Sequence, residues 1–94
     1  ENVYPAEIER ILNEHPSVLE SSAIGVPHPV WGEAIAAVVV LKDGEKLKED
    51  ELIQYCKGKI AGYKVPKLVY FLPEMPRNPA GKISKPELRK RFKI

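Results

Sequence analysis

The chain has 94 residues, of which 44% are hydrophobic and 30% are charged, and its formal net charge is +2. This length suits one domain with one core, and so small a charge does not by itself predict a nucleic-acid-binding protein. The longest apolar run, 34–41, is far too short to span a membrane, and the single cysteine, Cys56, excludes an internal disulfide.

The first half of the chain predicts a helix followed by two strands. Pro5 suits the first turn of a helix because its missing N–H is not needed there, and apolar residues then recur at helical spacing until Pro16. The β-branched and small residues of 18–26 predict a strand, which the prolines of 27–29 are expected to break. A connector then leads into 34–41, whose valines suit a strand buried on both faces.

The second half predicts a helix, a strand, a loop and a last helix. Acidic residues at 49–51 favour the start of a helix, which we expect Gly62 to end. Residues 68–72 have the composition of a strand. The segment 73–81 contains three prolines and one glycine and predicts a loop. Ser84, with a glutamate three residues later, fits a capping box that starts the last helix.

This order of elements predicts an α+β fold, in which about three helices cover one or both faces of a small three-stranded sheet. The Asp43-Gly44 pair is typical of a tight hairpin or loop, and a short hairpin added to the sheet is the alternative arrangement. We expect a single domain over 1–94. The abrupt start at Glu1-Asn2 indicates a cut within a longer chain, and the missing part would hold most of an active site.

Charge is distributed unevenly along the chain. Residues 1–20 carry five acids and one base, 57–67 carry four lysines and no acid, and 82–94 carry six bases and one acid. Basic segments of this kind suit anionic ligands, and a solvated basic face is the alternative interpretation.

The segment 76–82, Pro-Arg-Asn-Pro-Ala-Gly-Lys, is the strongest candidate for chemistry. Its prolines stiffen the loop, and Gly81 allows the backbone to approach a ligand closely. Lys82 then stands between a rigid loop and a capped helix, where an ammonium group can stabilise charge developing on a carboxylate or phosphoryl oxygen. The alternative is an ordinary solvated lysine.

Other catalytic patterns fail. A phosphate-binding Walker loop would need glycine at Pro76 and serine or threonine at Ile83, so we do not expect the domain to bind a nucleotide triphosphate alone. His15 and His28 are isolated from cysteine, which predicts no metal site, and His28 between prolines is interpreted as a turn residue. No nucleophile elbow occurs.

Four stretches resemble, in the same order, landmarks of the acyl-adenylate-forming superfamily, which includes acyl-CoA synthetases, peptide-synthetase adenylation domains and luciferases. Residues 1–9 resemble the segment after that family's hinge, and 28–33 resemble its Trp-Gly-Glu turn. Residues 63–67 are similar to its aromatic-Lys-x-Pro stretch, and 76–82 match its final Pro-x-x-x-x-Gly-Lys motif. Together the motifs are specific and span the whole chain, which most resembles a fatty-acid or aryl-acid CoA ligase.

The resemblance implies the mobile C-terminal domain of a larger cytoplasmic acid–thiol ligase involved in fatty-acid metabolism. A carboxylic acid would attack the α-phosphate of ATP to give an acyl-adenylate and pyrophosphate, with Lys82 as the catalytic lysine and Pro76 and Gly81 supporting its loop. The domain would then rotate, and coenzyme A would displace AMP. The large N-terminal domain, which is absent, would carry the acyl pocket and bind ATP with Mg²⁺. The isolated chain is therefore expected to be inactive.

The resemblance also implies a second surface that lines the thiol channel. Glu1 and Asn2 match the channel loop, and Trp31 matches an aromatic beside the pantetheine arm. Core packing of Trp31 is the alternative, because tryptophan is usually mostly buried.

The resemblance further implies that Tyr63 would stack on the adenine of coenzyme A and that Lys57, Lys64 and Lys67 would pair with its phosphates. A solvated basic face is an equal alternative for these lysines. Val65 occupies a position that is basic in some relatives, so it would make no phosphate contact.

Two other functions stay open. One is an adenylation domain that loads a carrier-protein thiol instead of coenzyme A. The other is a free-standing basic module for an anionic partner such as nucleic acid, which would bind with strong salt dependence. The second leaves the Trp-Gly-Glu turn and the Gly81-Lys82 loop unexplained, so we expect no nucleic-acid partner. The acid itself is not readable from this segment.

Overall fold

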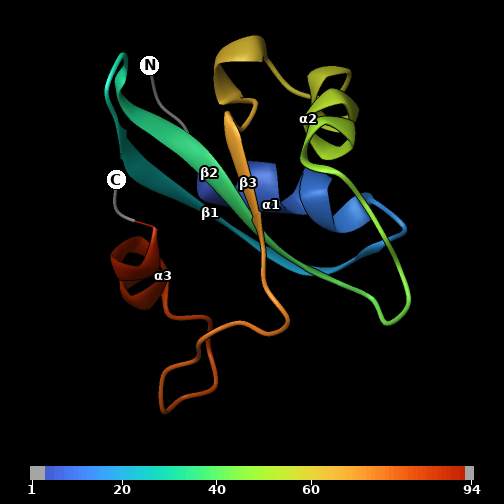
Figure 1. The fold of residues 1–94 in the computed structure, drawn as a ribbon, viewed down its shortest axis with the longest axis vertical. Coiled ribbons are helices and arrows are strands. Elements are labelled where there is room, and N and C mark those ends of the chain that lie inside the picture. Colours follow the sequence, from blue (N-terminus) through green and yellow to red (C-terminus); the bar gives the residue numbers. More distant parts are fainter. Residues whose placement is uncertain (1–3, 93–94) are drawn as a thin grey trace.

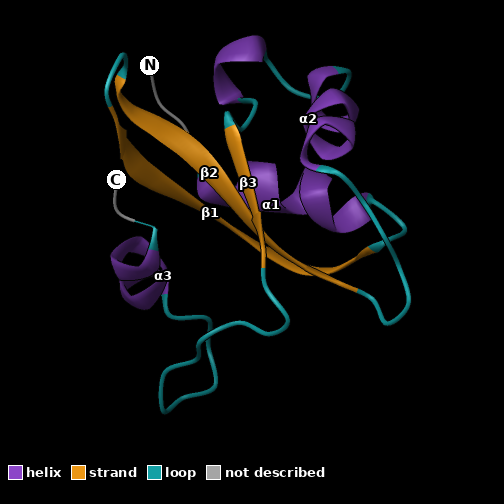
Figure 2. Ribbon diagram, viewed as in Figure 1, coloured by secondary structure: helices purple, strands orange, loops and turns teal. Residues whose placement is uncertain are grey.

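The computed structural model describes residues 4–92, which form three α-helices, one short 3-10 helix and a three-stranded sheet (Figures 1 and 2). The predicted α+β class is therefore confirmed. No helix in this part of the chain is long and apolar enough to cross a lipid bilayer. In chain order the elements are α1 (Pro5–Glu14), β1 (Val18–His28), β2 (Gly32–Leu41), α2 (Glu49–Lys57), η1 (Gly62–Lys64), β3 (Leu68–Phe71) and α3 (Lys85–Arg91).

The sheet has the strand order β1-β2-β3, with β1 antiparallel and β3 parallel to the central strand β2. The valine run of β2 is buried on both faces, as predicted, because successive side chains of a strand point to opposite sides. Val39 faces a cluster formed with α1 and α2, whereas Val38 faces a cluster formed with α3 and the loop before it. The domain thus has two hydrophobic clusters instead of the one core expected from its length.

The hairpin of β1 and β2 is longer than predicted. β1 continues through Pro27 and ends at His28, and β2 already begins at Gly32, so Pro27 does not break the first strand and the break lies at Pro29. The strand tolerates proline because β1 is an edge strand, on which half of the main-chain groups have no strand partner. The turn between the strands carries Trp31.

Two other boundaries differ from the sequence-based expectation. α2 ends at Lys57, well before Gly62, and Gly62 instead begins η1. Asp43-Gly44 forms a turn in the loop before α2, and residues 42–48 contain no added hairpin. The start of α3 is as predicted, because the hydroxyl of Ser84 accepts a hydrogen bond from the Glu87 main-chain N–H at 3.3 Å.

Glutamate side chains from two helices accept hydrogen bonds from main-chain N–H groups at the two outer edges of the sheet. The main-chain N–H of Ala23 on β1 donates to Glu9 at 2.8 Å, and Lys85, which pairs with Glu9 at 2.9 Å, donates to the Ala23 carbonyl at 3.1 Å. On the opposite edge, the N–H of Val69 donates to Glu49 at 2.7 Å. These contacts join α1, α2 and α3 to the sheet and reduce the open edge that another strand could pair with.

Candidate functional site

The loop that carries Lys82 closes on itself through main-chain hydrogen bonds. The N–H of Asn78 donates to the Lys82 carbonyl at 2.8 Å, and the N–H of Ser84 donates to the Pro76 carbonyl at 2.8 Å. An isolated antiparallel bridge joins residues 77 and 83. Gly81 adopts φ +85°, a left-handed conformation that favours glycine, so its backbone freedom is required by the turn itself.

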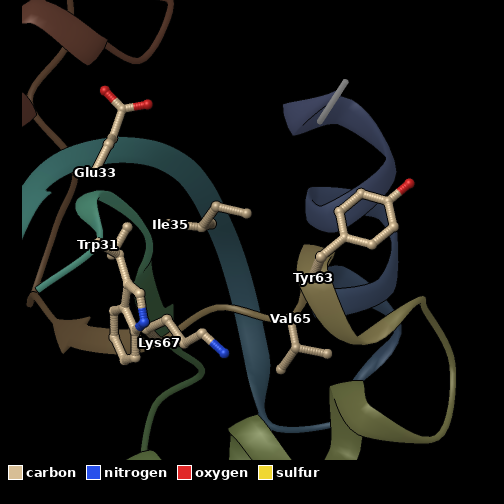
Figure 3. Close-up of a pocket in the computed structure, with 7 residues that line it drawn as sticks. Trp31, Glu33, Ile35, Tyr63, Val65 and Lys67 are labelled. Atoms are coloured by element: carbon tan, nitrogen blue, oxygen red, sulfur yellow. The ribbon is translucent and has the colours of Figure 1, made fainter. Parts of the chain in front are cut away.

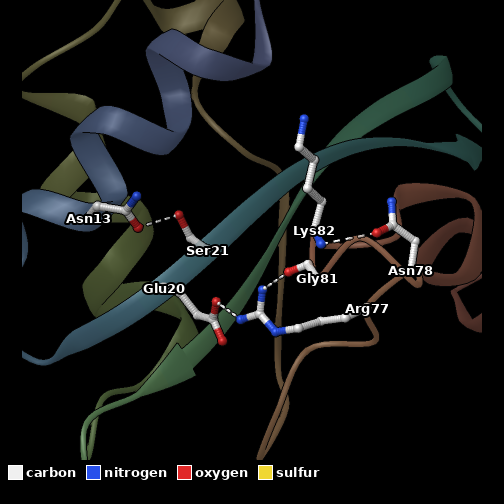
Figure 4. A network of polar contacts seen from close by, with 7 residues as sticks. All are labelled: Asn13, Glu20, Ser21, Arg77, Asn78, Gly81 and Lys82. Atoms are coloured by element: carbon white, nitrogen blue, oxygen red, sulfur yellow. Dashed lines mark hydrogen bonds and ion pairs between the residues drawn. The ribbon is translucent and has the colours of Figure 1, made fainter.

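The side chain of Asn78 fixes the backbone of Lys82. Its Oδ1 accepts hydrogen bonds from the main-chain N–H groups of Ala80 and Lys82, each at 3.0 Å. The Lys82 side chain extends away from the loop (Figure 4), and its amino group has no hydrogen-bond or ion-pair partner within residues 4–92. The loop therefore fixes the main chain of Lys82 and leaves its ammonium group available for a ligand.

Arg77 connects the loop to the sheet. Its Nη1 donates to the Gly81 carbonyl at 3.0 Å, and its Nη2 forms an ion pair with Glu20 on β1 (Figure 4). Sequence reasoning missed Glu20, which lies 57 residues before Arg77, because no local pattern links the two positions.

A second candidate surface is an open depression of about 510 Å³ beside the β1–β2 turn (Figure 3). Three of its lining residues come from different elements: Trp31 from that turn, Tyr63 from η1 and Lys67 from the segment before β3. Trp31 is 58% exposed, so the core-packing alternative for this residue is wrong. Tyr63 is 46% exposed. The remaining lining residues are Glu33, Ala34, Ile35 and Val65.

The lysines predicted for this surface are not all gathered on it. Lys67 places its Nζ 5.3 Å from the centroid of the Trp31 indole. Lys57 lines an adjoining hollow of about 640 Å³, of which Lys67 is also part. Lys64 instead turns toward α1, where its Nζ pairs with Glu7 at 2.9 Å, and this hydrogen bond raises the pKa of the lysine.

Two further residues, Glu1 and Asn2, lie outside the described part of the chain. Within residues 4–92, no group of three or more His, Cys, Asp or Glu side chains gathers in a way that could hold a metal ion.

The two candidate surfaces lie at opposite ends of the domain. The Lys82 loop lies at one end of the long axis, and η1 and the β1–β2 turn lie toward the other end (Figure 1). The domain measures 32 Å along this axis, so one ligand-sized site does not include both surfaces.

Residues 7–82 match the AMP-binding enzyme C-terminal domain. The chain belongs to this family. Feruloyl-CoA synthase from Amycolatopsis is 49% identical over 92 residues, an alignment that covers 98% of this chain and 19% of that enzyme. ATP-bound MatB from Rhodopseudomonas palustris superposes with a TM-score of 0.93 at 41% identity, over 98% of this chain and 18% of that structure. A fatty acyl CoA synthetase from Mycobacterium tuberculosis gives 0.89 at 47% identity, with the same coverage.

The AMP-binding C-terminal domain thus spans less than a fifth of the length of these relatives. Its membership confirms the resemblance to adenylate-forming CoA ligases that the four motifs indicated. The matched region contains every predicted site residue except Glu1 and Asn2, and it ends at Lys82.

Proposed function

We propose that this chain is the single mobile C-terminal domain of a larger ATP-dependent acyl-CoA synthetase, and that it serves both half-reactions in turn. The observation that carries the proposal is the separation of two unlike surfaces on one small domain. One presents an ammonium group that has no partner among residues 4–92, on a stiffened loop, and the other presents exposed aromatics beside lysines. A domain that rotates between steps uses such an arrangement, because each step requires a different surface at the same place.

In the first step, the substrate carboxylate attacks the α-phosphate of ATP, which forms the acyl-adenylate and releases pyrophosphate, and Lys82 contacts both reacting groups. Both groups are anionic, and an ammonium group between them offsets their repulsion and stabilises charge that develops in the transition state. The Lys82 backbone is already fixed by Asn78, and Gly81 and Pro76 shape the loop, so little reorganisation accompanies the reaction. Mg²⁺ accompanies ATP and is bound mainly by the large domain.

In the second step, the depression around Trp31 forms part of the coenzyme A channel, together with Glu1 and Asn2. Trp31 lies beside the pantetheine arm and Tyr63 stacks on the adenine, because both rings are exposed and line the same hollow. Lys67 and Lys57 pair with the phosphates, and Lys64 contributes when it leaves Glu7. The partners of the domain are the N-terminal domain of the same cytoplasmic enzyme, a carboxylic acid, ATP and coenzyme A.

The test is Lys82→Ala in the full-length enzyme, with the two half-reactions measured separately. Acid-dependent pyrophosphate exchange should fall by about 10²-fold or more, the loss typical of an electrostatic catalytic contact. Thioester formation from preformed acyl-adenylate and coenzyme A should persist. The matched control is Lys46→Ala, which removes another exposed lysine, outside both surfaces, and should leave both rates unchanged.

If both half-reactions of Lys82→Ala proceed at nearly wild-type rates, the catalytic role is wrong. Replacing coenzyme A with a phosphopantetheinylated carrier protein distinguishes the two thiol acceptors. Faster transfer to the carrier than to coenzyme A would favour an adenylation domain that loads a carrier.

A further inference from the structure

His28 makes an unusual set of contacts at the end of β1. Its Nδ1 accepts hydrogen bonds from the main-chain N–H groups of Val30 at 3.1 Å and Trp31 at 3.3 Å. Its ring also stacks on the Trp31 indole, with the ring centroids 4.1 Å apart and an interplanar angle of 27°. One imidazole thus contacts both the backbone and the side chain of the same tryptophan.

Little else holds the Trp31 side chain. Trp31 is 58% exposed and the preceding residue, Val30, is 77% exposed, and neither belongs to a hydrophobic cluster. Within residues 4–92 the ring partners of the indole are His28 and the ammonium group of Lys67, which lies 5.3 Å from its centroid. An exposed tryptophan without such contacts would lose conformational entropy on binding a ligand, and pre-ordering lowers that cost.

We propose that His28 is a positioning residue for coenzyme A binding, which sets the place of Trp31 through the two main-chain hydrogen bonds accepted by Nδ1. The inference rests on the proposed function, because it takes Trp31 as part of the thiol channel. His28 itself need not touch the ligand. Both partners of Nδ1 are N–H donors, so this nitrogen must present its lone pair and the ring proton must lie on Nε2.

Two substitutions separate the acceptor from the ring. His28→Phe keeps an aromatic ring that can stack on Trp31 but removes the acceptor. His28→Asn removes the ring but keeps an oxygen acceptor on a short side chain, which can bond main-chain N–H groups two or three residues on, as in an Asx turn. If the hydrogen bonds position Trp31, the asparagine variant should bind coenzyme A nearly as well as the wild-type enzyme, and the phenylalanine variant should bind it more weakly.

The experiment uses the full-length enzyme and measures the KM for coenzyme A in thioester formation. The acyl-adenylate is made from whichever of butanoic, octanoic, hexadecanoic and benzoic acids supports pyrophosphate exchange. His28→Phe should raise this KM by about threefold to tenfold, the loss expected for one or two hydrogen bonds, and should change kcat less. His28→Asn should stay within about twofold of wild type. Pyrophosphate exchange, which needs a folded domain, should be unchanged in both variants.

The positioning role of His28 and the thiol-channel role of Trp31 can fail separately. Trp31→Ala is measured alongside, and an unchanged KM for coenzyme A in that variant would overturn the thiol-channel assignment itself. If Trp31→Ala raises the KM and His28→Phe does not, only the positioning role of His28 is overturned. The positioning role is also overturned if His28→Asn raises the KM for coenzyme A as much as His28→Phe does. It is overturned as well if His28→Phe impairs pyrophosphate exchange as much as it impairs thioester formation.

Discussion

The carboxylate of Glu20 on β1 and the guanidinium of Arg77 in the Lys82 loop form an ion pair across 57 residues of sequence. The same guanidinium donates to the carbonyl of Gly81, the residue directly before Lys82. Glu20 is therefore connected, through one side chain, to the backbone next to the proposed catalytic lysine. Its contribution should appear in the geometry of the loop more than in the stability of the domain.

Arg77→Ala should lower pyrophosphate exchange by about threefold to tenfold, because even a small displacement of a catalytic group lowers the rate. The effect on stability should be small, since partly exposed ion pairs contribute only about 0.2–1 kcal/mol. Both half-reactions are measured in the full-length enzyme. Arg91→Ala, which removes a similarly exposed pair with Glu87, is the control, and the rates of both its half-reactions should be close to those of the wild-type enzyme. Equal losses in both half-reactions would indicate general damage instead of a displaced loop.

Gly81→Ala should destabilise the 94-residue chain by about 1–2 kcal/mol and slow pyrophosphate exchange. The cause is the backbone, because Gly81 has φ +85° and a new Cβ would meet no atom within 4 Å. Gly58→Ala is the matched control, since Gly58 has φ −86° and equally open space, and alanine there should be neutral or stabilising by up to about 1 kcal/mol. Urea unfolding measures both. Similar values for the two variants would contradict the conformational explanation.

Local sequence patterns predicted the elements whose determinants are local. The valines of β2 indicated a buried strand, and Ser84 indicated the start of α3. The end of β1 could not be predicted in this way, because tolerance of Pro27 depends on β1 lying at the sheet edge. Strand order depends on pairing between distant segments, so it could not be predicted from local patterns in a single sequence.

The same distinction applies to the candidate sites. Pro76, Gly81 and Lys82 form one short motif, so their association was visible in the sequence. The pairs that Glu20 and Glu7 make each join residues 57 positions apart, and only folding brings them together. Lys64 illustrates the consequence, because the family resemblance implied a phosphate contact for it, whereas its Nζ pairs with Glu7.

This difference between the lysines makes a prediction for coenzyme A. Lys67→Met should raise the KM for coenzyme A by about threefold to tenfold, because Lys67 lines both hollows and its ammonium group, which lies 5.3 Å from the Trp31 ring centroid, pairs with no carboxylate among residues 4–92. Lys64→Met should have a smaller effect, since binding a phosphate would first require Lys64 to leave Glu7. Lys59→Met, outside both hollows, is the control. A larger effect at Lys64 than at Lys67 would show that the ion pair with Glu7 opens when coenzyme A binds.

Cys56 provides a pH-dependent test of the cluster between α1, α2 and the sheet. Its side chain is fully buried, and burial raises the pKa of the thiol above its usual value of 9.0. Above about pH 9 the unfolded chain therefore loses a proton that the folded chain keeps, and this favours unfolding. The thiol's contribution to stability is complete below that pH and falls as pH rises toward the folded-state value.

The measurement is the free energy of urea unfolding of the wild-type chain minus that of Cys56→Ala, from about pH 7 to pH 10. The difference should be constant near neutral pH and then decrease, by at most about 1.4 kcal/mol per pH unit. Subtracting the alanine variant cancels the tyrosines and lysines that titrate in the same range, because both proteins share them. A difference that stays constant to pH 10 would mean that the thiol ionises equally in both states. The packing of Cys56 in the cluster of α1, α2 and the sheet would then be looser than its burial indicates.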